Sequence, residues 1–354
     1  MAKKIQILGA GLSGMIAAID LVRHDYEVTI LEAASGLGGR GNFHPSTHAT
    51  PLDRDAAWKF IGLDLSQGFR PAKLFRVYFG EQGYDLDPND LYIVERGARE
   101  NSLDSMVYRE AQKLGVKFEF NQMVKNPRDL PPGSIFATGL FPEMFKALGI
   151  PAREAYGWAS RMPMEGGPAC VVYFDSYIGD YYYSSTTNGL FFSMLFQRTD
   201  VPRADMERCQ DFLRRHEQLE CKDWFHATNW IPVANARNPR LFAGDKILAG
   251  TLAGMMDPMF LFGINGAVLS GRIAARAVYE PDQAQKDFAY YSRNYARNYR
   301  AQKIQSRIPA WLKIRLGRRM LTLPKSLLRN ALDPDKLGIP GVKEFNLFDQ
   351  IKKL

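Results

Sequence analysis

Hydrophobic residues near the start of the chain follow strand-like and helix-like patterns in turn. Ile5 to Leu8 is a short apolar run, Met15 to Arg23 is a helical stretch, and Val28 to Leu31 is a second apolar run. Glycines separate the first run from the helical stretch. Because short apolar runs bounded by turn residues are typical of buried strands, the pattern predicts a strand, a glycine turn, a helix and a second strand.

Later segments return to this pattern. Ser102 is a candidate N-cap for a helix that ends near Gly115, and residues 264–278 form a second helical stretch of small and apolar residues. The candidate strands are residues 91–95, 116–120, 134–139 and 246–249. We therefore predict an α/β domain that is assembled from segments far apart in the sequence.

Residues 169–197 are aromatic and rich in β-formers. Three candidate strands cover Ala169 to Phe174, Tyr181 to Ser184 and Leu190 to Phe196, and Asn188-Gly189 marks a hairpin turn between the last two. This spacing predicts an antiparallel sheet in a second domain. A polar surface helix is expected at residues 203–219.

A glycine motif lies between the first strand and the first helix, in the sequence GAGLSG from residue 9 to residue 14. Gly9 permits a tight turn, Gly11 lets the backbone approach a pyrophosphate, and Gly14 lets the helix and the strand pack closely. The N–H groups near Leu12 and Ser13 lie at the positive end of the helix dipole and are available to phosphates. The motif therefore predicts a dinucleotide site.

Glu32 follows the second strand, 18 residues after the last glycine of the motif. A carboxylate at this position accepts hydrogen bonds from ribose hydroxyls and disfavours a 2′-phosphate, so NADP is not expected here. The next residues resemble the glycine-rich loop of FAD-dependent oxidoreductases, in which an arginine reaches toward the cofactor phosphates. This likeness favours FAD over NAD. The residues of the loop that are expected to contact it are Ala33, Gly38, Gly39 and Arg40.

Length and composition restrict the class of protein. At 354 residues the chain is long enough for two domains and a large core. No signal peptide is expected from the first residues, and no apolar run approaches the ~18 residues that span a bilayer. The three cysteines and five histidines have no metal-ligand spacing. We therefore expect a cytoplasmic protein with reduced thiols and no metal.

Positive charge is concentrated at the C-terminal end. Residues 285–354 hold 16 Lys and Arg against 5 Asp and Glu, a net charge of +11, so the rest of the chain carries −3 of the total of +8. An apolar stripe with Trp311 in its middle runs among these charges, and Pro309 is expected to split the segment into two helices. The stripe consists of Ile304, Ile308, Leu312, Leu316 and Met320.

Two interpretations of this basic segment fit equally well. In the first, the segment lies in an anionic membrane interface, on the inner face of the membrane. In the second, its apolar stripe covers the body of the protein and its charges face water. Nucleic acid is a poorer partner, because no recognised binding module accompanies the charge.

Three separate blocks of sequence resemble the flavoprotein superfamily of geranylgeranyl reductases and para-hydroxybenzoate hydroxylase. The blocks are residues 9–40, residues 96–115 together with the Phe136-Ala137-Thr138-Gly139 stretch, and residues 247–275. The resemblance implies a Rossmann-like FAD-binding domain with a second, antiparallel substrate domain. It also implies that an arginine before the helix at residue 102 contacts the flavin side, with Arg99 the candidate and Arg96 its rival.

The resemblance also assigns cofactor contacts in the later blocks. The family has an aspartate that binds ribityl hydroxyls where this chain has Thr251; either flavin binding is weaker here or Asp257 substitutes for that aspartate. The helix that begins at residue 264 is expected to face the ribityl chain and the flavin ring. The further expected contacts are Val124, Thr138, Gly139, Gly250, Gly263, Ile264 and Asn265.

The implied organisation has three parts. Residues 1–50, 91–160 and 232–284 are expected to form the discontinuous FAD-binding domain, residues 51–90 and 161–231 the substrate domain, and residues 285–354 the basic helical segment. The implied activity is hydride transfer from reduced flavin to a C=C bond of an isoprenoid or other lipophilic substrate.

Two other functions stay open: a flavin monooxygenase that hydroxylates an aromatic substrate, and a flavin-binding adaptor without turnover. Beyond the glycine-rich loop at residues 36–41, no further GxGxxG motif follows along the chain, so electrons are expected from a reduced nicotinamide in transient contact or from a ferredoxin-like protein. No catalytic residue can be assigned from the sequence. Candidate proton donors are His44, His48 and Tyr182.

Overall fold

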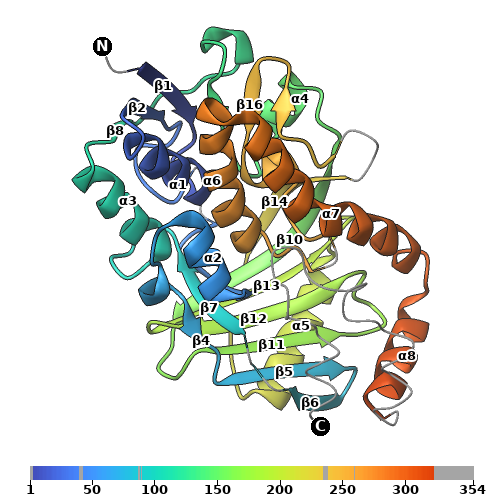
Figure 1. The fold of residues 1–354 in the computed structure, drawn as a ribbon. Helices are drawn as coiled ribbons and strands as arrows, with labels where there is room; N and C mark the ends of the chain where they lie inside the picture. The colour runs from blue at the N-terminus through green and yellow to red at the C-terminus, as the bar shows by residue number, and fades with distance from the viewer. Residues whose placement is uncertain are drawn as a thin grey trace.

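The computed structural model of the chain describes residues 3–39, 43–86, 88, 90–233, 238–258 and 260–322. Arg40 and residues 323–354 lie outside this part. Three sheets and the helices packed on them make up the described chain (Figure 1).

The first sheet carries the N-terminal motif. It has six strands in the order β15-β16-β9-β1-β2-β8, and its central strands are parallel, as expected for a Rossmann-like domain. The helices packed with it include α1 (Leu12–Val22), α3 (Leu103–Lys113) and α6 (Ile264–Tyr279). The strands are β1 (Lys3–Leu8), β2 (Tyr26–Leu31), β8 (Lys117–Glu119), β9 (Ile135–Phe136), β15 (Phe242–Ala243) and β16 (Lys246–Leu248).

Apolar burial explains why these distant segments meet. Ile7 on β1, Met15 on α1 and Ile30 on β2 are fully buried in one cluster with residues of β9, β16 and α6. Removing this much apolar surface from water is the main favourable term in the fold. Gly271 brings α6 close to α1, because a Cβ at this position would lie 2.6 Å from the backbone oxygen of Ser13.

The second sheet confirms the predicted antiparallel domain. It has seven strands in the order β14-β10-β13-β12-β11-β5-β6, and most of its neighbours are antiparallel. Asn188 (φ 52°) and Gly189 (φ 71°) form the predicted hairpin turn. The strands are β5 (Leu74–Phe79), β6 (Gln82–Leu86), β10 (Ala152–Pro163), β11 (Ala169–Phe174), β12 (Tyr181–Thr187), β13 (Leu190–Gln197) and β14 (Phe225–Pro232).

A small third sheet has the order β3-β7-β4 and contacts the second sheet through β3 and β7. Residues 152–160, expected in the FAD-binding domain, belong instead to the second sheet through β10. The remaining elements are β3 (Ser46–Pro51), β4 (Arg70–Pro71), β7 (Leu91–Arg96), α2 (Arg54–Ile61), α4 (Pro142–Ala147), α5 (Arg203–His216) and the 3₁₀ turns at Ser66–Gly68, Pro127–Asp129 and Gly250–Ala253.

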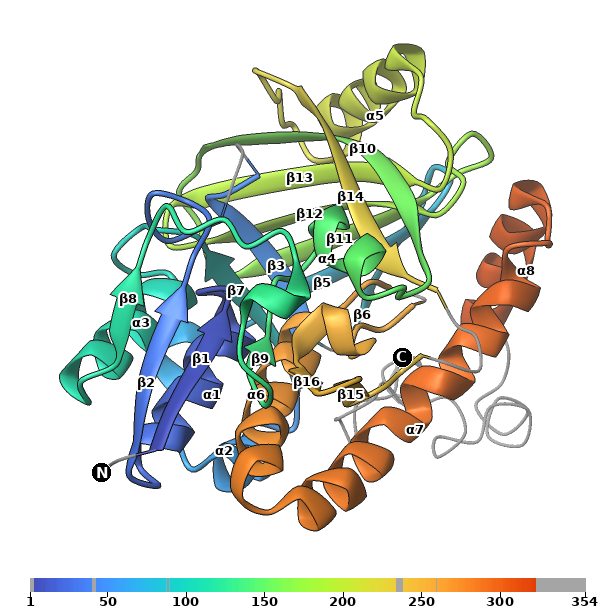
Figure 2. The same cartoon turned by 90° about the horizontal axis from the view of Figure 1, so that it is seen from above.

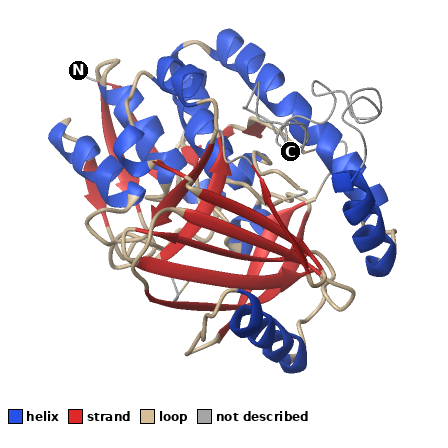
Figure 3. Cartoon of the chain, turned by 90° about the horizontal axis from the view of Figure 1, so that it is seen from below, coloured by secondary structure: helices blue, strands red, loops and turns tan. Residues whose placement is uncertain are grey.

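Two C-terminal helices follow, α7 (Pro281–Gln305) and α8 (Ala310–Thr322), and they are separated at Pro309 as predicted. Figure 2 shows α7 running along the first domain and α8 continuing toward the second sheet. Arg318 Nε on α8 donates a hydrogen bond of 2.8 Å to the carbonyl of Phe79 on β5. Figure 3 shows α5 on the side of the large sheet away from the first domain, and α8 at one end of that sheet.

Candidate active site

The three motif glycines have different structural roles. Gly9 has a φ of 107°, and a Cβ there would lie 2.5 Å from the carbonyl oxygen of Ala137, so both the turn and the packing require glycine. A Cβ at Gly14 would lie 2.1 Å from the Gly9 oxygen. At Gly11, by contrast, the backbone is extended and the nearest atom to a Cβ is 3.9 Å away. Gly11 therefore leaves open space beside the turn, while Gly9 and Gly14 serve the fold.

Two helices begin at this site without a side-chain cap. Gly11 is the N-cap of α1 and Gly263 is the N-cap of α6, and neither end has a capping hydrogen bond from a side chain. Both residues line the same cavity. Unpaired N–H groups at helix N-termini favour anions and electron-rich groups, so the two ends present positive partial charge to the cavity.

The Glu32 carboxylate is held beside the glycine turn. Its Oε2 accepts a hydrogen bond of 2.8 Å from the Ala10 N–H, and its Oε1 accepts one of 2.8 Å from the Ala34 N–H. These bonds fix the carboxylate at the end of β2, where it lines the cavity. An ionised carboxylate can accept further bonds, so Glu32 is available to hydroxyl donors of a ligand.

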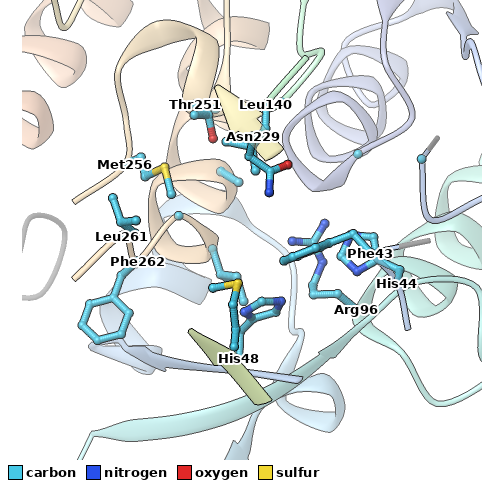
Figure 4. Close-up of a pocket in the computed structure, with 18 of the residues that line it drawn as sticks. Phe43, His44, His48, Arg96, Leu140, Asn229, Thr251, Met256, Leu261 and Phe262 are labelled. Atoms are coloured by element: carbon cyan, nitrogen blue, oxygen red, sulfur yellow. The ribbon is translucent and has the colours of Figure 1, made fainter. Parts of the chain in front are cut away.

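A single cavity of about 820 Å³ extends from this turn to the second sheet. Its volume is within the range of sites for small molecules and cofactors. Figure 4 shows its middle part, where Thr251 and Asn229 lie on one side and His44, His48 and Arg96 on another. Most of the predicted cofactor residues line it: Gly9, Gly11, Leu12, Ser13, Glu32, Ala33, Gly38, Gly39, Val124, Thr138, Gly139, Gly250, Thr251, Gly263 and Ile264.

Four of the predicted contacts that the structure describes do not line the cavity: Gly14, which packs against the turn, and Asp257, Asn265 and Arg99. Asp257 is fully buried, and its carboxylate accepts hydrogen bonds from the Phe260 N–H (2.6 Å) and the Asn298 side chain (3.0 Å). It therefore holds its own loop against α7. Asn265 is also fully buried, and its Oδ1 accepts a bond from the Gly266 N–H. Arg40 lies outside the described residues.

Arg99 is the fourth of these contacts. It forms an ion pair with Glu95 at 3.3 Å and donates to the carbonyl of Asn188, away from the cavity. Its rival Arg96 lines the cavity. Arg96 is the last residue of β7 and is therefore held by the third sheet, whereas Arg99 lies beyond the end of the strand.

Arg96 forms a buried pair with Asp104, the second residue of α3. Arg96 Nε and Nη2 donate to the two carboxylate oxygens at 2.7 and 2.9 Å, a bidentate arrangement. Burial opposes ionisation of Asp104, but the Arg96 charge, the hydrogen bonds from Arg96 and the Gly97 N–H, and the His44 charge together outweigh it and lower the pKa of the carboxyl. The pair is therefore ionised, and it holds the guanidinium in place at the cavity wall.

Two histidines, which were candidate proton donors, are linked at the cavity by one hydroxyl. Ser46 Oγ is 2.7 Å from His44 Nδ1 and 2.8 Å from His48 Nε2. Burial lowers the pKa of His44 to about 4 and that of His48 to about 3, and the Arg96 charge adds to the shift of each. Both imidazoles are therefore neutral at pH 7.

Tyr182, the third candidate proton donor, does not line the cavity. Its side chain is fully buried on the other face of the large sheet, where its hydroxyl meets Ser193 and α5 covers it. Tyr181 and Tyr183 point to the cavity face, because successive residues of a strand alternate between faces. The alternation was predictable from the sequence, but the identity of the cavity face was not.

The half of the cavity at the second sheet is apolar, with Phe75, Val77, Cys170 and Val172 in its wall. Its far end is lined by residues of the C-terminal helices and of the turn between them: Gln305, Ile308, Lys313, Leu316 and Gly317. Sequence reasoning missed this role of α8, and it also missed Asn229, Met256, Leu261 and Phe262, which carry no motif.

The residues present fit an FAD molecule. Thr138 Oγ1 is buried without a hydrogen-bond partner in the described chain, and the open space at Gly11 and the two uncapped helix ends face the same cavity. Thr251 lines it where a ribityl-binding side chain is expected. No group of His, Cys, Asp and Glu that could hold a metal ion occurs within the part that the structure describes.

Comparison with known proteins agrees with this geometry. Residues 7–59 match the family model of the NAD(P)-binding Rossmann-like domain. A geranylgeranyl bacteriochlorophyll reductase-like protein from Thermoplasma acidophilum superposes with a TM-score of 0.69 at 15% identity, over 100% of this chain and 96% of that one. The flavin-dependent brominase Bmp2 gives 0.66 at 13% identity, over 100% and 98% of the two chains.

The chain shares the fold of these two proteins. CtdE, whose structure was solved in complex with FAD, has the same fold, with a TM-score of 0.59, 15% identity and 100% coverage of both chains. A flavin-containing monooxygenase from Arabidopsis thaliana is 22% identical over 124 residues, which are 35% of this chain and 27% of that protein. The predicted resemblance and fold class are confirmed.

Proposed function

We propose that the protein is an FAD-dependent oxidoreductase that acts on a lipophilic substrate. The observation that supports this most is the continuity of the cavity, which joins the dinucleotide turn at Gly9 to Gly14 with an apolar chamber under the second sheet. A cofactor held at one end and an apolar molecule held at the other would meet near Thr251 and Arg96.

The chain offers a distinct group for each part of FAD. The N–H groups at the start of α1 would hold the pyrophosphate, Glu32 the adenosine ribose, and Thr251 and the start of α6 the ribityl chain and the flavin ring. Bound FAD supplies two-electron chemistry by accepting and donating hydride. The positive end of the α6 dipole would favour negative charge at the flavin end of the site.

The histidine pair would carry a proton to or from the substrate. Neutral His44 and His48 each have one ring N–H and one acceptor nitrogen, and Ser46 Oγ can accept from one ring while donating to the other. A proton transferred along this series of hydrogen bonds would reach the cavity surface while both imidazoles return to the neutral form. The adjacent Arg96 would disfavour a cationic imidazole.

Reduction of a C=C bond in an isoprenoid or similar chain is the reaction that we favour. A long apolar wall suits an extended hydrocarbon, and a proton source is needed to complete a hydride addition. The second candidate is an oxygen-dependent hydroxylation of an aromatic substrate. The similarity to the Arabidopsis thaliana flavin-containing monooxygenase supports the monooxygenase class but not the aromatic substrate.

The electron donor would be a reduced nicotinamide in transient contact or a small redox protein.

The substrate would enter from an anionic membrane surface beside α8. Trp311 and Ile304 are 59% and 65% exposed there, with Arg307 and Arg315 also exposed beside them. Apolar side chains among basic ones are typical of helices that lie in a membrane interface. Within the described residues no helix is long and apolar enough to cross a bilayer.

Photoreduction of the FAD-loaded protein without oxygen would test the proposal. Addition of a polyprenyl substrate should reoxidise the protein and yield the saturated product under anaerobic conditions. Reoxidation only by oxygen, with hydroxylation of an added aromatic compound, would favour the monooxygenase. A protein that takes up no FAD, even in excess, would overturn both reactions.

A further inference from the structure

A group of basic side chains gathers where α8 meets the open end of the large sheet. Arg153 lies on β10, Arg198 follows β13, and Lys313 lies on α8. Asp180, between β11 and β12, is the carboxylate among them, with its Oδ1 3.9 Å from Arg198 Nη2. The three basic residues therefore exceed the acidic one by two charges.

Strand register places the two arginines on the cavity side of the sheet. Tyr181 lines the cavity and pairs with Phe196, which in turn pairs with Gly157. Because side chains two residues apart share a face, Arg198 follows Phe196 onto this face. Arg153 lies four residues before Gly157 and shares it too. Lys313 and Asp180 line the far end of the cavity, and the two arginines are next to this pair but outside the lining itself.

Several polar atoms of this group have no hydrogen-bond partner, although Arg198 also forms the long ion pair with Asp180. Arg153 Nη1, Arg198 Nε and Nη2, and the hydroxyl of Tyr299 on α7 are buried, and none has a hydrogen bond among the described residues. Lys313 Nζ donates to the carbonyl of Gly179 at 3.3 Å, which leaves two of its three protons available. Buried donors without acceptors cost free energy, so this group requires an acceptor.

The charges of the group interact with one another. The pKa of Arg153 falls to about 10, first because of burial and then because of the Arg198 charge. Burial also lowers the pKa of Lys313, and Arg198 lowers it further while Asp180 opposes the change. An added anion would relieve this repulsion and would accept from the unpaired donors.

We propose that Arg198, Lys313 and Arg153 form a binding site for an oxyanion, a phosphate or carboxylate group, at the far end of the cavity. The ligand that the site fits is the anionic head of an amphiphile whose apolar chain extends along the cavity toward Arg96. This inference rests on the proposed function for the role of the chain as substrate, but binding of the anion does not depend on FAD or turnover.

Binding of decyl phosphate, decanol and inorganic phosphate to the full-length protein, with and without FAD, tests the site. Decyl phosphate should bind at least about tenfold more tightly than decanol, and Lys313→Gln and Arg198→Gln should each remove most of that difference. Asp180→Asn should have the opposite effect to these two variants and tighten decyl phosphate binding several-fold, because it removes the carboxylate that competes with the ligand. An exposed arginine on α5 provides the control: Arg203→Gln removes the same charge and should change nothing.

The three ligands separate the possible sources of the anion. Tighter binding of decyl phosphate than of inorganic phosphate supports an amphiphile, and equal binding of the two supports a free anion at the same site. Two results would overturn the site: equal binding of decyl phosphate and decanol by the wild type, or unchanged binding in Lys313→Gln and Arg198→Gln. Thermal unfolding of each variant shows that it is folded. A protein that binds no FAD but still shows these differences would refute the proposed oxidoreductase and leave the anion site standing.

Discussion

Replacement of Gly11 by alanine separates cofactor binding from folding. Gly11 has a φ of −79° and a ψ of 176°, an extended conformation that alanine adopts without strain. An added Cβ has only one neighbour within 4 Å, the Ala137 oxygen at 3.9 Å. The methyl group would instead project into the cavity beside the start of α1, where the pyrophosphate is expected.

The magnitudes of the two effects differ. Because the new methyl group meets no atom too closely, the free energy of unfolding should change by no more than about 0.5 kcal/mol. Loss of one or two charge-assisted hydrogen bonds between backbone N–H groups and phosphate costs about 1.5–3 kcal/mol each. Since about 1.4 kcal/mol corresponds to a factor of ten, FAD affinity should fall by at least roughly tenfold.

The assay is titration of the apoprotein with FAD, followed by flavin fluorescence, together with urea unfolding of the apoprotein. Gly14→Ala is the matched comparison. Its Cβ would lie 2.1 Å from the Gly9 oxygen, so it should destabilise the apoprotein itself by several kcal/mol, of the order seen for overpacked cores. Wild-type FAD affinity in Gly11→Ala would refute the placement of the pyrophosphate at this turn.

Three further predictions follow from the site and the C-terminal helices. The pKa values of His44 and His48 lie near 4 and 3 in the folded protein and near 6.5 in the unfolded chain, so between these pH values the unfolded state binds more protons. The free energy of unfolding should therefore fall as the pH drops below about 6.5, by up to about 1.4 kcal/mol per pH unit for each histidine. Urea titrations at several pH values measure this slope, and His48→Gln should reduce it. Arg96→Gln leaves the Asp104 carboxylate buried without its partner and should cost about 3–5 kcal/mol in urea unfolding; a loss below about 1 kcal/mol would contradict the buried pair. The double variant Trp311→Ser, Arg315→Gln should bind anionic liposomes at least roughly fivefold more weakly in a sedimentation assay, whereas Arg203→Gln should bind them as the wild type does. Equal binding by the wild type, the double variant and Arg203→Gln would exclude α8 as the membrane contact.

The N-terminal site was predictable because its parts are close in sequence. The turn at Gly9, the start of α1 and the Glu32 carboxylate form within about thirty residues, and their spacing follows from the geometry of one strand, one helix and the next strand. The hairpin at Asn188 and the helix break at Pro309 were predictable for the same reason, since each depends on the backbone preferences of single residues.

The choice between Arg96 and Arg99 depended on tertiary structure. The two residues are three positions apart, and only the end of β7 decides which of them reaches the cavity. The misplacement of Tyr182 has the same cause, because the pattern shows that faces alternate but does not show which face meets the first domain. Asp257, the suggested substitute for the family aspartate, and Asn265, a predicted cofactor contact, are each hydrogen-bonded to the backbone of their own loop or helix.

By itself, the sequence determined the elements and the nucleotide turn, because local backbone geometry and short spacings control them. The tertiary structure alone decided where the cavity runs, that α8 closes its far end, and that Arg153, Arg198 and Lys313 meet around Asp180. These residues are separated by up to 160 positions, and only strand register and helix packing bring their charges together.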